Sequence, residues 1–340
     1  MRRLLMVLLV LVAAAQPARA GTGSDTQTAL WRYGDTGGAW TGADGTYSVE
    51  LPDGRIAWLF SDTFLGQVHD GARPSDSPFV HNSIVLQDHD QFSTLVTPGP
   101  GAEINPVEGA GYYWLGDGVV ENNELLVFCL RFASVPVPFG FQQIGVDIAR
   151  FSLPSMKLQS VERAPQAFQP APAPVSYGSA IMQDGGYDYV YGVEDLHADK
   201  YLHVARVRAG HLLDGTWEYF GPNGWTTNAL LSSRGLNGIA NELSVSPVGG
   251  QYVLVSQDHS IGADIVAFTA PAPTGPWSVP RTLYTASEAA RGLLTYNAKA
   301  HEELSSPGDF VISYNVNTTN AAQLYSDVSS YRPRFVDVTL

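Results

Sequence analysis

Polar residues able to do chemistry recur along this chain at a regular spacing. One stands in each of five short segments about 60 to 70 residues apart, and these residues are Asp44, Asp117, Ser179, Glu242 and His301. Two carboxyl groups that face each other can hydrolyse a glycosidic bond, because one protonates the leaving oxygen while the other activates water or attacks the sugar. The residue types therefore favour glycoside hydrolysis, provided that the fold brings these segments together.

Further candidates stand beside these segments. Asp62 follows the apolar stretch Trp58–Phe60, and His81 and Asn82 begin the strand expected after the next loop. We take Asp44, Asp62 and Glu242 as the candidate catalytic residues. The candidate substrate-binding residues are Trp40, His81, Asn82, Asp117, Ser179, Asn241, Lys299 and His301.

Aromatic side chains gather around the first two polar segments. They are Trp40, Tyr47, Tyr112, Tyr113 and Trp114. Their flat rings suit stacking on sugars, although aromatic side chains also fill the core between neighbouring sheets.

Each polar candidate also has a purely structural interpretation. Asp44 precedes a glycine and Asp117 lies between two, so both fit simple turns, and Asp62 fits a loop cap that binds backbone N–H groups. His301 fits a hydrogen-bonded core histidine as well as a ligand or proton donor. Glu242 is harder to explain in this way, since a structural carboxylate directly before an apolar strand needs a partner.

The elements that must position these residues are β-strands. Apolar stretches of four to seven residues, rich in Val, Ile, Tyr and Phe, alternate with Gly, Pro, Asp and Asn turns. After each polar segment comes a strongly apolar strand, and these five strands are expected at Ile56–Phe60, Leu125–Leu130, Tyr187–Tyr191, Tyr252–Val255 and Phe310–Tyr314. Five such repeats predict an all-β fold, a five-bladed β-propeller whose polar first strands line a central channel.

The repeats run through the chain without a break in composition. We therefore expect one catalytic domain over residues 21–340, with either Ala29–Trp31 or Arg334–Val338 closing the last blade. A β-sandwich of similar strand number would not predict polar strands at regular spacing. A monomer is expected.

The N-terminus has the pattern of a signal peptide over residues 1–20. Arg2 and Arg3 precede the apolar run Leu4–Ala15, and Ala18 and Ala20 provide small residues at a cleavage site. The apolar run is too short to cross a bilayer. We therefore expect a secreted protein without a membrane anchor.

Charge and composition restrict the partners. The chain has a net charge of −14, which becomes −17 when the three arginines of the signal peptide are removed. Such a surface repels nucleic acid and anionic lipid, but neutral polysaccharides remain possible partners.

The single cysteine, Cys129, lies in an apolar strand and is expected to be a buried thiol. We expect no cofactor and no catalytic metal, although a structural calcium ion on the propeller axis is possible.

Two segments of the first repeat resemble a known family. Trp40-Thr-Gly-Ala-Asp44-Gly-Thr-Tyr-Ser-Val49 and Trp58-Leu-Phe-Ser-Asp62-Thr-Phe-Leu-Gly66 are similar to the opening of a secreted family that includes glycoside hydrolase family 183, the endo-D-arabinanases. The later segments Asn241–Ser246 and Tyr296–His301 look similar too. The resemblance covers nearly the whole chain after the signal peptide.

The resemblance implies a five-bladed hydrolase. Its substrate would be the α-D-arabinofuranosyl linkages of cell-wall arabinan, as in arabinogalactan and lipoarabinomannan, cleaved internally and with inversion. The paired catalytic aspartates of the family fall on Asp44 and Asp62, which are 18 residues apart. Two alternatives stay open, a hydrolase of another furanoside polymer and a non-catalytic carbohydrate-binding or surface propeller.

Overall fold

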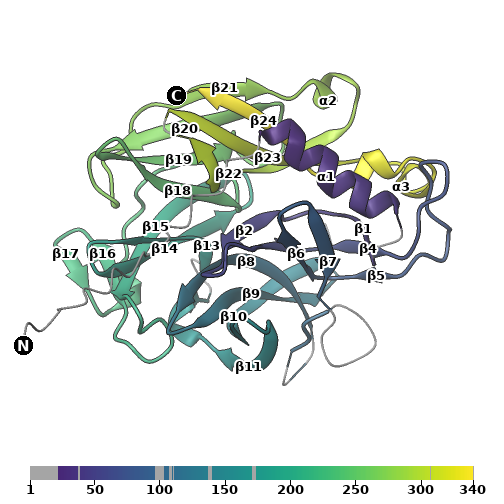
Figure 1. Cartoon of the computed structure of the whole chain (residues 1–340). Helices are drawn as coiled ribbons and strands as arrows, with labels where there is room; N and C mark the ends of the chain where they lie inside the picture. Colours follow the sequence, from purple (N-terminus) through teal and green to yellow (C-terminus); the bar gives the residue numbers. More distant parts are fainter. Residues whose placement is uncertain are drawn as a thin grey trace, which may run out of the picture.

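The computed structural model of the chain describes residues 22–36, 39–95, 103–106, 109, 111–136, 140–170, 174–306 and 308–339. The expected signal peptide lies outside these ranges. In the part of the chain that is described, the strands form six antiparallel sheets, which Figure 1 colours in sequence order. The fold is therefore all-β, as predicted.

The first three of the larger sheets follow one another along the chain. The first contains β2 (Tyr47–Glu50), β3 (Ile56–Phe60), β6 (Ser83–Asp88) and β7 (Gln91–Thr94). The second contains β8 (Tyr112–Glu121), β9 (Glu124–Ser134), β10 (Phe141–Ser152) and β11 (Lys157–Arg163). The third contains β12 (Phe168–Gln169), β13 (Val175–Asp184), β14 (Tyr187–Leu196), β15 (Asp199–Arg208), β16 (Glu218–Gly221) and β17 (Gly224–Thr226).

Two more large sheets and one small sheet complete the set. The fourth contains β18 (Leu243–Val248), β19 (Gln251–Gln257), β20 (Asp264–Ala270) and β21 (Arg281–Thr285). The fifth contains β22 (Leu294–Ser306), β23 (Asp309–Asn317) and β24 (Arg334–Thr339). The small sheet joins β1 (Trp40–Ala43), β4 (Thr63–Leu65) and β5 (Phe79–Val80). All five predicted apolar strands are confirmed within β3, β9, β14, β19 and β23.

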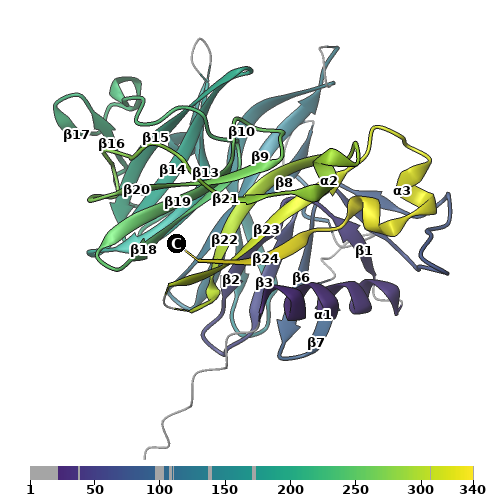
Figure 2. The ribbon, with the colours of Figure 1, turned by 90° about the horizontal axis from the view of Figure 1, so that it is seen from above.

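The innermost strands of the five large sheets contact one another in a ring. Strand β2 contacts β8, β8 contacts β13, β13 contacts β18, β18 contacts β22, and β22 contacts β2 again. Figures 1 and 2 show the same closure, because the purple strands of the first sheet lie beside the yellow-green strands of the fifth. The polar segments on these strands, or directly before them, are therefore brought together.

Hydrophobic side chains fill each interface between neighbouring sheets. Five separate clusters of buried apolar residues lie between the first and second, second and third, third and fourth, fourth and fifth, and fifth and first sheets. Cys129 is fully buried in the first of these clusters, and its pKa is raised by burial, as expected for a core thiol. The removal of this apolar surface from water stabilises the ring.

A helix that the sequence did not predict covers the junction of the first and last sheets. It is α1 (Gly23–Asp35), and its start is capped by Thr22, whose Oγ1 accepts a hydrogen bond from the Asp25 backbone N–H at 3.2 Å. Leu30 inserts into the cluster between the fifth and first sheets. The expectation of a strand at Ala29–Trp31 is wrong, because these residues are helical, whereas the strand at Arg334–Val338 is confirmed as part of β24 paired with β23.

The remaining helical segments are short. They are α2 (Ser287–Ala290), α3 (Gln323–Ser326) and the 3-10 turns η1 (Pro165–Ala167), η2 (Ala229–Leu231) and η3 (Val328–Tyr331). Among the described residues, no helix is both long and apolar enough to cross a membrane.

Candidate active site

The polar segments coincide with irregularities in the innermost strands. The pairing register shifts between Leu115 and Gly118 in β8, between Tyr177 and Ala180 in β13, and between Tyr296 and Lys299 in β22. A bulge of this kind turns a side chain away from the regular alternation of the strand. The bulges therefore let polar residues face the centre of the ring while their neighbours remain in the core.

Asp44 and Asp62 lie at the two adjacent points where the chain passes between the small sheet and the first sheet. Asp44 separates β1 from β2, and Asp62 separates β3 from β4. The Asp44 N–H donates to the Asp62 carbonyl at 3.1 Å, and the Ser61 N–H donates to the Asp44 carbonyl at 2.8 Å. Gly45 makes this approach possible, because its φ is +86° and an added Cβ would lie 2.8 Å from the Ser61 nitrogen. The backbone thus holds the two aspartates side by side.

The Asp44 carboxyl group is surrounded by phenols and by other carboxylates. Tyr296 donates a hydrogen bond to its Oδ2 at 2.8 Å, and Tyr331 also hydrogen-bonds to it. Burial, followed by the negative charges of Asp62 and Glu242, raises the pKa of Asp44 to about 8, although the two tyrosines oppose this shift. The surroundings of Asp44 therefore favour its protonated form.

Two ring nitrogens bind the carboxyl group of Asp62. Its Oδ1 accepts a hydrogen bond from the Trp114 Nε1–H at 2.9 Å and lies 2.9 Å from His81 Nδ1. An indole N–H can only donate, so Asp62 acts as an acceptor at this atom. The hydrogen bond to Asp62 also raises the pKa of His81. The two neighbouring aspartates consequently have different environments.

Glu242 forms an ion pair with a buried lysine. Lys299 Nζ lies 2.5 Å from Glu242 Oε2, and it also donates to the Asn297 carbonyl at 3.2 Å and to the Gly45 carbonyl. All three ammonium protons therefore have acceptors. Burial lowers the pKa of Lys299 and raises that of Glu242, while each residue's charge opposes the shift of the other.

Asp117 is a fourth carboxyl group near the centre, and it interacts with the positive charge of Lys299. The Asp117 carboxyl accepts backbone N–H bonds from Gly118 at 2.8 Å and from Ile181 at 2.9 Å, which connects β8 to β13. Burial raises its pKa to about 7, opposed by these two bonds and by Lys299. The structure therefore gathers four carboxyl groups and one ammonium group, those of Asp44, Asp62, Asp117, Glu242 and Lys299, at the centre of the ring.

Three of the predicted substrate-binding residues belong to the core instead. Trp40 is fully buried against Phe60, with 5.2 Å between the ring centroids. Asn82 is fully buried and bonds to the backbone of Ile104 and Tyr113. The structure therefore places Trp40 and Asn82 in the core rather than at an open ligand-binding surface.

His301 is likewise a core residue. Its Nδ1 lies 2.5 Å from Ser48 Oγ, its Nε2 lies 2.7 Å from Ser313 Oγ, and its ring packs on Trp58. Burial lowers its pKa to about 3, so the imidazole is neutral. This placement fits the alternative interpretation of His301 as a hydrogen-bonded core histidine.

Two other predicted substrate-binding residues, Ser179 and Asn241, lie apart from the two aspartates. Ser179 is buried, and its carbonyl accepts a hydrogen bond from the Tyr47 hydroxyl at 3.0 Å, so its backbone rather than an open side chain faces the site. Asn241 is exposed, and its Nδ2 donates to Asp195 Oδ2 at 2.7 Å. Neither residue contacts the carboxyl groups of Asp44 or Asp62.

Sequence reasoning missed Tyr296 and Tyr331, the two phenols on Asp44. Tyr296 opens the polar segment that contains Lys299, so its neighbours offered a signal. Tyr331 ends η3 and carries no such pattern. Among the described residues, no group of three or more His, Cys, Asp or Glu side chains is arranged to hold a metal ion.

The family is established by its sequence model. Residues 28–339 match the family described as "Domain of unknown function (DUF5005)". This chain belongs to that family. No curated protein matches the sequence.

Solved structures show what fold this DUF5005 chain shares. A Bacteroides ovatus protein described as a "putative hydrolase" is 23% identical, with a TM-score of 0.75 over 92% of this chain and 89% of that one. An endo-arabinase from Bacteroides thetaiotaomicron is 12% identical, with a TM-score of 0.52 over 88% of this chain and 94% of that one. An exo-β-1,3-galactanase from Phanerochaete chrysosporium is 13% identical, with a TM-score of 0.55 over 88% of this chain and 60% of that one. The chain thus shares the fold of propeller-type glycoside hydrolases.

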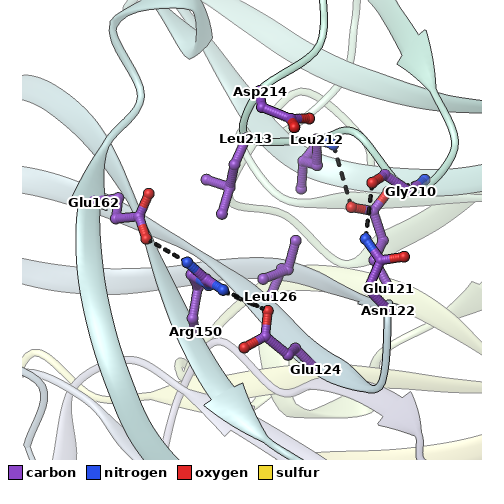
Figure 3. Close-up of a pocket in the computed structure, with 10 residues that line it drawn as sticks. All are labelled: Glu121, Asn122, Glu124, Leu126, Arg150, Glu162, Gly210, Leu212, Leu213 and Asp214. Carbon is purple, nitrogen blue, oxygen red and sulfur yellow. Dashed lines mark hydrogen bonds and ion pairs between the residues drawn. The ribbon is translucent and has the colours of Figure 1, made fainter.

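A cavity of about 250 Å³ lies at the other end of β8 from the aspartates (Figure 3). Within it, Arg150 bridges Glu124 and Glu162, each at 2.8 Å. Glu121 accepts the backbone N–H groups of Gly210 at 2.6 Å and Leu212 at 3.2 Å. These polar groups already satisfy one another, and the cavity is therefore not the candidate active site of the DUF5005 chain.

Proposed function

We propose that this protein is a glycoside hydrolase that cleaves α-D-arabinofuranosyl linkages in cell-wall arabinan, with Asp44 as general acid and Asp62 as general base. The observation that carries the proposal is the contrast between two adjacent aspartates. Asp44 is enclosed, with its pKa raised to about 8, whereas Asp62 accepts hydrogen bonds from Trp114 and His81. Acid and base chemistry at one site requires two carboxyl groups whose environments differ in this way.

The proposed reaction uses the two aspartates in one step. Asp44 donates its proton to the glycosidic oxygen as the bond from this oxygen to the anomeric carbon breaks. Asp62 takes a proton from a water molecule, whose oxygen attacks the anomeric carbon from the opposite face of the sugar. The product has inverted configuration, Asp44 is left ionised and Asp62 is left protonated. Asp44 then gains a proton from solvent and Asp62 loses one to it, which restores both groups.

Glu242 has a supporting role in this proposal. Its carboxylate is bound to Lys299, and its negative charge helps to raise the pKa of Asp44. Lys299 in turn binds the carbonyl of Gly45, the residue next to the acid. In this proposal Glu242, a candidate catalytic residue in the sequence analysis, and Lys299, a candidate substrate-binding residue there, both act as positioning residues.

The fold supports the proposal as a five-bladed propeller. The ring of contacts from β2 through β8, β13, β18 and β22, together with one apolar cluster at each interface, is what five blades around an axis require. We take the chain after residue 20 as one catalytic domain, secreted and monomeric, without a cofactor. These features rest on the sequence pattern.

The substrate class rests on sequence resemblance to the endo-D-arabinanases of glycoside hydrolase family 183. An endo-arabinase also shares the fold. The net charge of −14 suits a neutral polysaccharide better than an anionic polymer. Internal cleavage is the expected mode, because the endo-D-arabinanases that the sequence resembles are endo-acting.

Product analysis tests the proposal directly. The purified protein should be incubated with arabinogalactan and with lipoarabinomannan, and the products separated by size. We expect oligosaccharides of several lengths, and proton NMR at early times should show inverted anomers. Binding of both polysaccharides without any release of products would instead support the alternative of a non-catalytic carbohydrate-binding propeller.

A further inference from the structure

A row of aromatic rings passes Asp62 and reaches the protein surface at both ends. We call Phe79, His81, Tyr112, Trp114 and Phe141 the aromatic strip. Neighbouring ring centroids are 6.0 Å apart for Phe79 and His81, 3.9 Å for His81 and Tyr112, 5.7 Å for Tyr112 and Trp114, and 4.7 Å for Trp114 and Phe141. The contacts are unbroken from one end to the other, although the rings come from separate strands and the loop after β5.

The aromatic strip is continuous with the proposed catalytic site. His81 and Trp114, which lie inside the row, both bind the same Asp62 oxygen at 2.9 Å. A ligand positioned for attack at Asp62 therefore has these rings as its immediate neighbours.

Both ends of the strip remain open to solvent. Phe79 is 46% exposed and Phe141 is 36% exposed, whereas most large apolar side chains of this protein are buried. Phe132 is only 9% exposed and packs beneath Trp114 and Phe141, at 4.4 and 5.7 Å between centroids. The surface rings are thus supported from below, as in a preformed binding surface.

We propose that the aromatic strip is a binding subsite for the sugar units of a polysaccharide chain that extend beyond the cleaved bond. The inference rests on the proposed function, because the catalytic centre determines where the cleaved bond of the polysaccharide lies relative to the strip. Aromatic faces bind the C–H faces of sugars by apolar contact, while the sugar hydroxyls remain free to hydrogen-bond to nearby polar groups. A neutral ligand of this kind also tolerates the acidic protein.

The alternative is that the rings only pack against one another. Packing explains Phe132 and the inner faces of Tyr112 and Trp114. It does not explain why the two exposed phenylalanines stand at the two ends of one unbroken row of rings that passes Asp62, unlike the exposed Leu230, which belongs to no such row. The strip is therefore better explained as a surface that a ligand covers.

Binding measurements with two ligand lengths test this subsite. In an Asp44→Asn background, which stops cleavage, the affinities for an α-D-arabinofuranosyl disaccharide and octasaccharide are measured by titration calorimetry. We expect Phe79→Ala and Phe141→Ala each to weaken octasaccharide binding by about 2- to 10-fold. Disaccharide binding should weaken less, because a disaccharide covers less of the strip than an octasaccharide does.

A matched control and an activity assay separate the possible outcomes. Leu230→Ala removes an apolar side chain that is 75% exposed and lies in η2, and it should alter neither affinity. Unchanged octasaccharide affinity, equal loss for both lengths, or no binding by the Asp44→Asn parent would overturn the subsite. If the wild type cleaves no arabinan but the length-dependent loss is seen, the subsite stands and the proposed hydrolysis fails.

Discussion

At the scale of single residues, the local surroundings of two aspartates decide their chemistry. Asp44 is enclosed by phenols, and the neighbouring charges of Asp62 and Glu242 add to the effect of burial in raising its pKa to about 8. Asp62, whose backbone is bonded to that of Asp44, accepts hydrogen bonds from the rings of Trp114 and His81. The same residue type can therefore act as acid at one position and as base at the next.

The pH dependence should report the protonated state of Asp44. A general acid works below its pKa, so kcat/KM should fall as the pH rises through about 8. Tyr296 hydrogen-bonds to Asp44 and lowers its pKa, so Tyr296→Phe should move this alkaline limb to higher pH. Profiles of kcat/KM against pH measure the shift. Tyr314→Phe, which removes a phenol bound to Glu288 in the fifth sheet, is the control. A limb that stays in place or moves to lower pH in Tyr296→Phe would contradict the assignment.

The contributions of Lys299 and Glu242 to stability should depend on each other, because the two residues form a buried ion pair. Lys299→Met leaves Glu242 without its partner at a site where both side chains are largely shielded, with exposed fractions of 2% and 15%. We expect a loss of about 3 to 5 kcal/mol in the free energy of unfolding. Lys299→Met combined with Glu242→Gln should recover part of that loss. Urea unfolding of the two single variants and the double variant measures the coupling, and additive losses would show that the pair is not a unit.

At the scale of strands and helices, the site depends on interruptions of regular structure. The apolar second strands could be predicted because Val, Ile, Tyr and Phe cluster in short runs between turn residues. The helix α1 could not, because its buried positions Gly23, Thr26, Leu30 and Gly34 include one large apolar residue. An amphipathic pattern is invisible when the inward face is made of small residues.

The bulges also limited the prediction of the site. Sequence spacing placed Asp44, Asp62, Glu242 and Lys299 at the centre, where the structure has them. It also placed His301 there, but the strand after the β22 bulge turns His301 into the core beside Trp58. A one-residue change of register reverses the face of a side chain, so burial could not be deduced without knowing where each bulge falls.

The bulge in β13 can be tested through its glycine. Gly178 has a φ of +111°, and an added Cβ would lie 2.6 Å from the buried ring of Phe128. Gly185 also has a positive φ, +56°, but nothing lies within 4 Å of its added Cβ. Gly178→Ala should therefore lower the free energy of unfolding by about 1 to 3 kcal/mol more than Gly185→Ala. Equal losses, measured by urea unfolding, would show that crowding at the bulge is unimportant.

At the scale of the whole molecule, stability and function depend on closure of the ring. The chain brings its first and last sheets together through the apolar cluster that includes Trp58, Val311 and Leu30. Figure 1 shows α1 lying along this junction, beside β24. The central carboxyl groups come from the first, second and fourth sheets and Lys299 comes from the fifth, so an open ring would separate them.

Removing the anchor of α1 should weaken the closure. Leu30→Ala deletes a fully buried side chain, and we expect a loss of about 2 to 5 kcal/mol in the free energy of unfolding. The exposed Leu230→Ala should change it by less than about 0.5 kcal/mol. Thermal or urea unfolding measures both variants. A loss for Leu30→Ala as small as that for Leu230→Ala would mean that α1 does not stabilise the junction.

The most direct test of the central claim is the release of oligosaccharides from arabinogalactan by Asp44→Asn and Asp62→Asn. Each variant should keep the circular dichroism spectrum of the wild type and release products at least about 100-fold more slowly. Asp214→Asn, at the far end of the molecule in the cavity of Figure 3, should be as active as the wild type. Release at the wild-type rate by either Asp44→Asn or Asp62→Asn would contradict the assignment of this pair as acid and base.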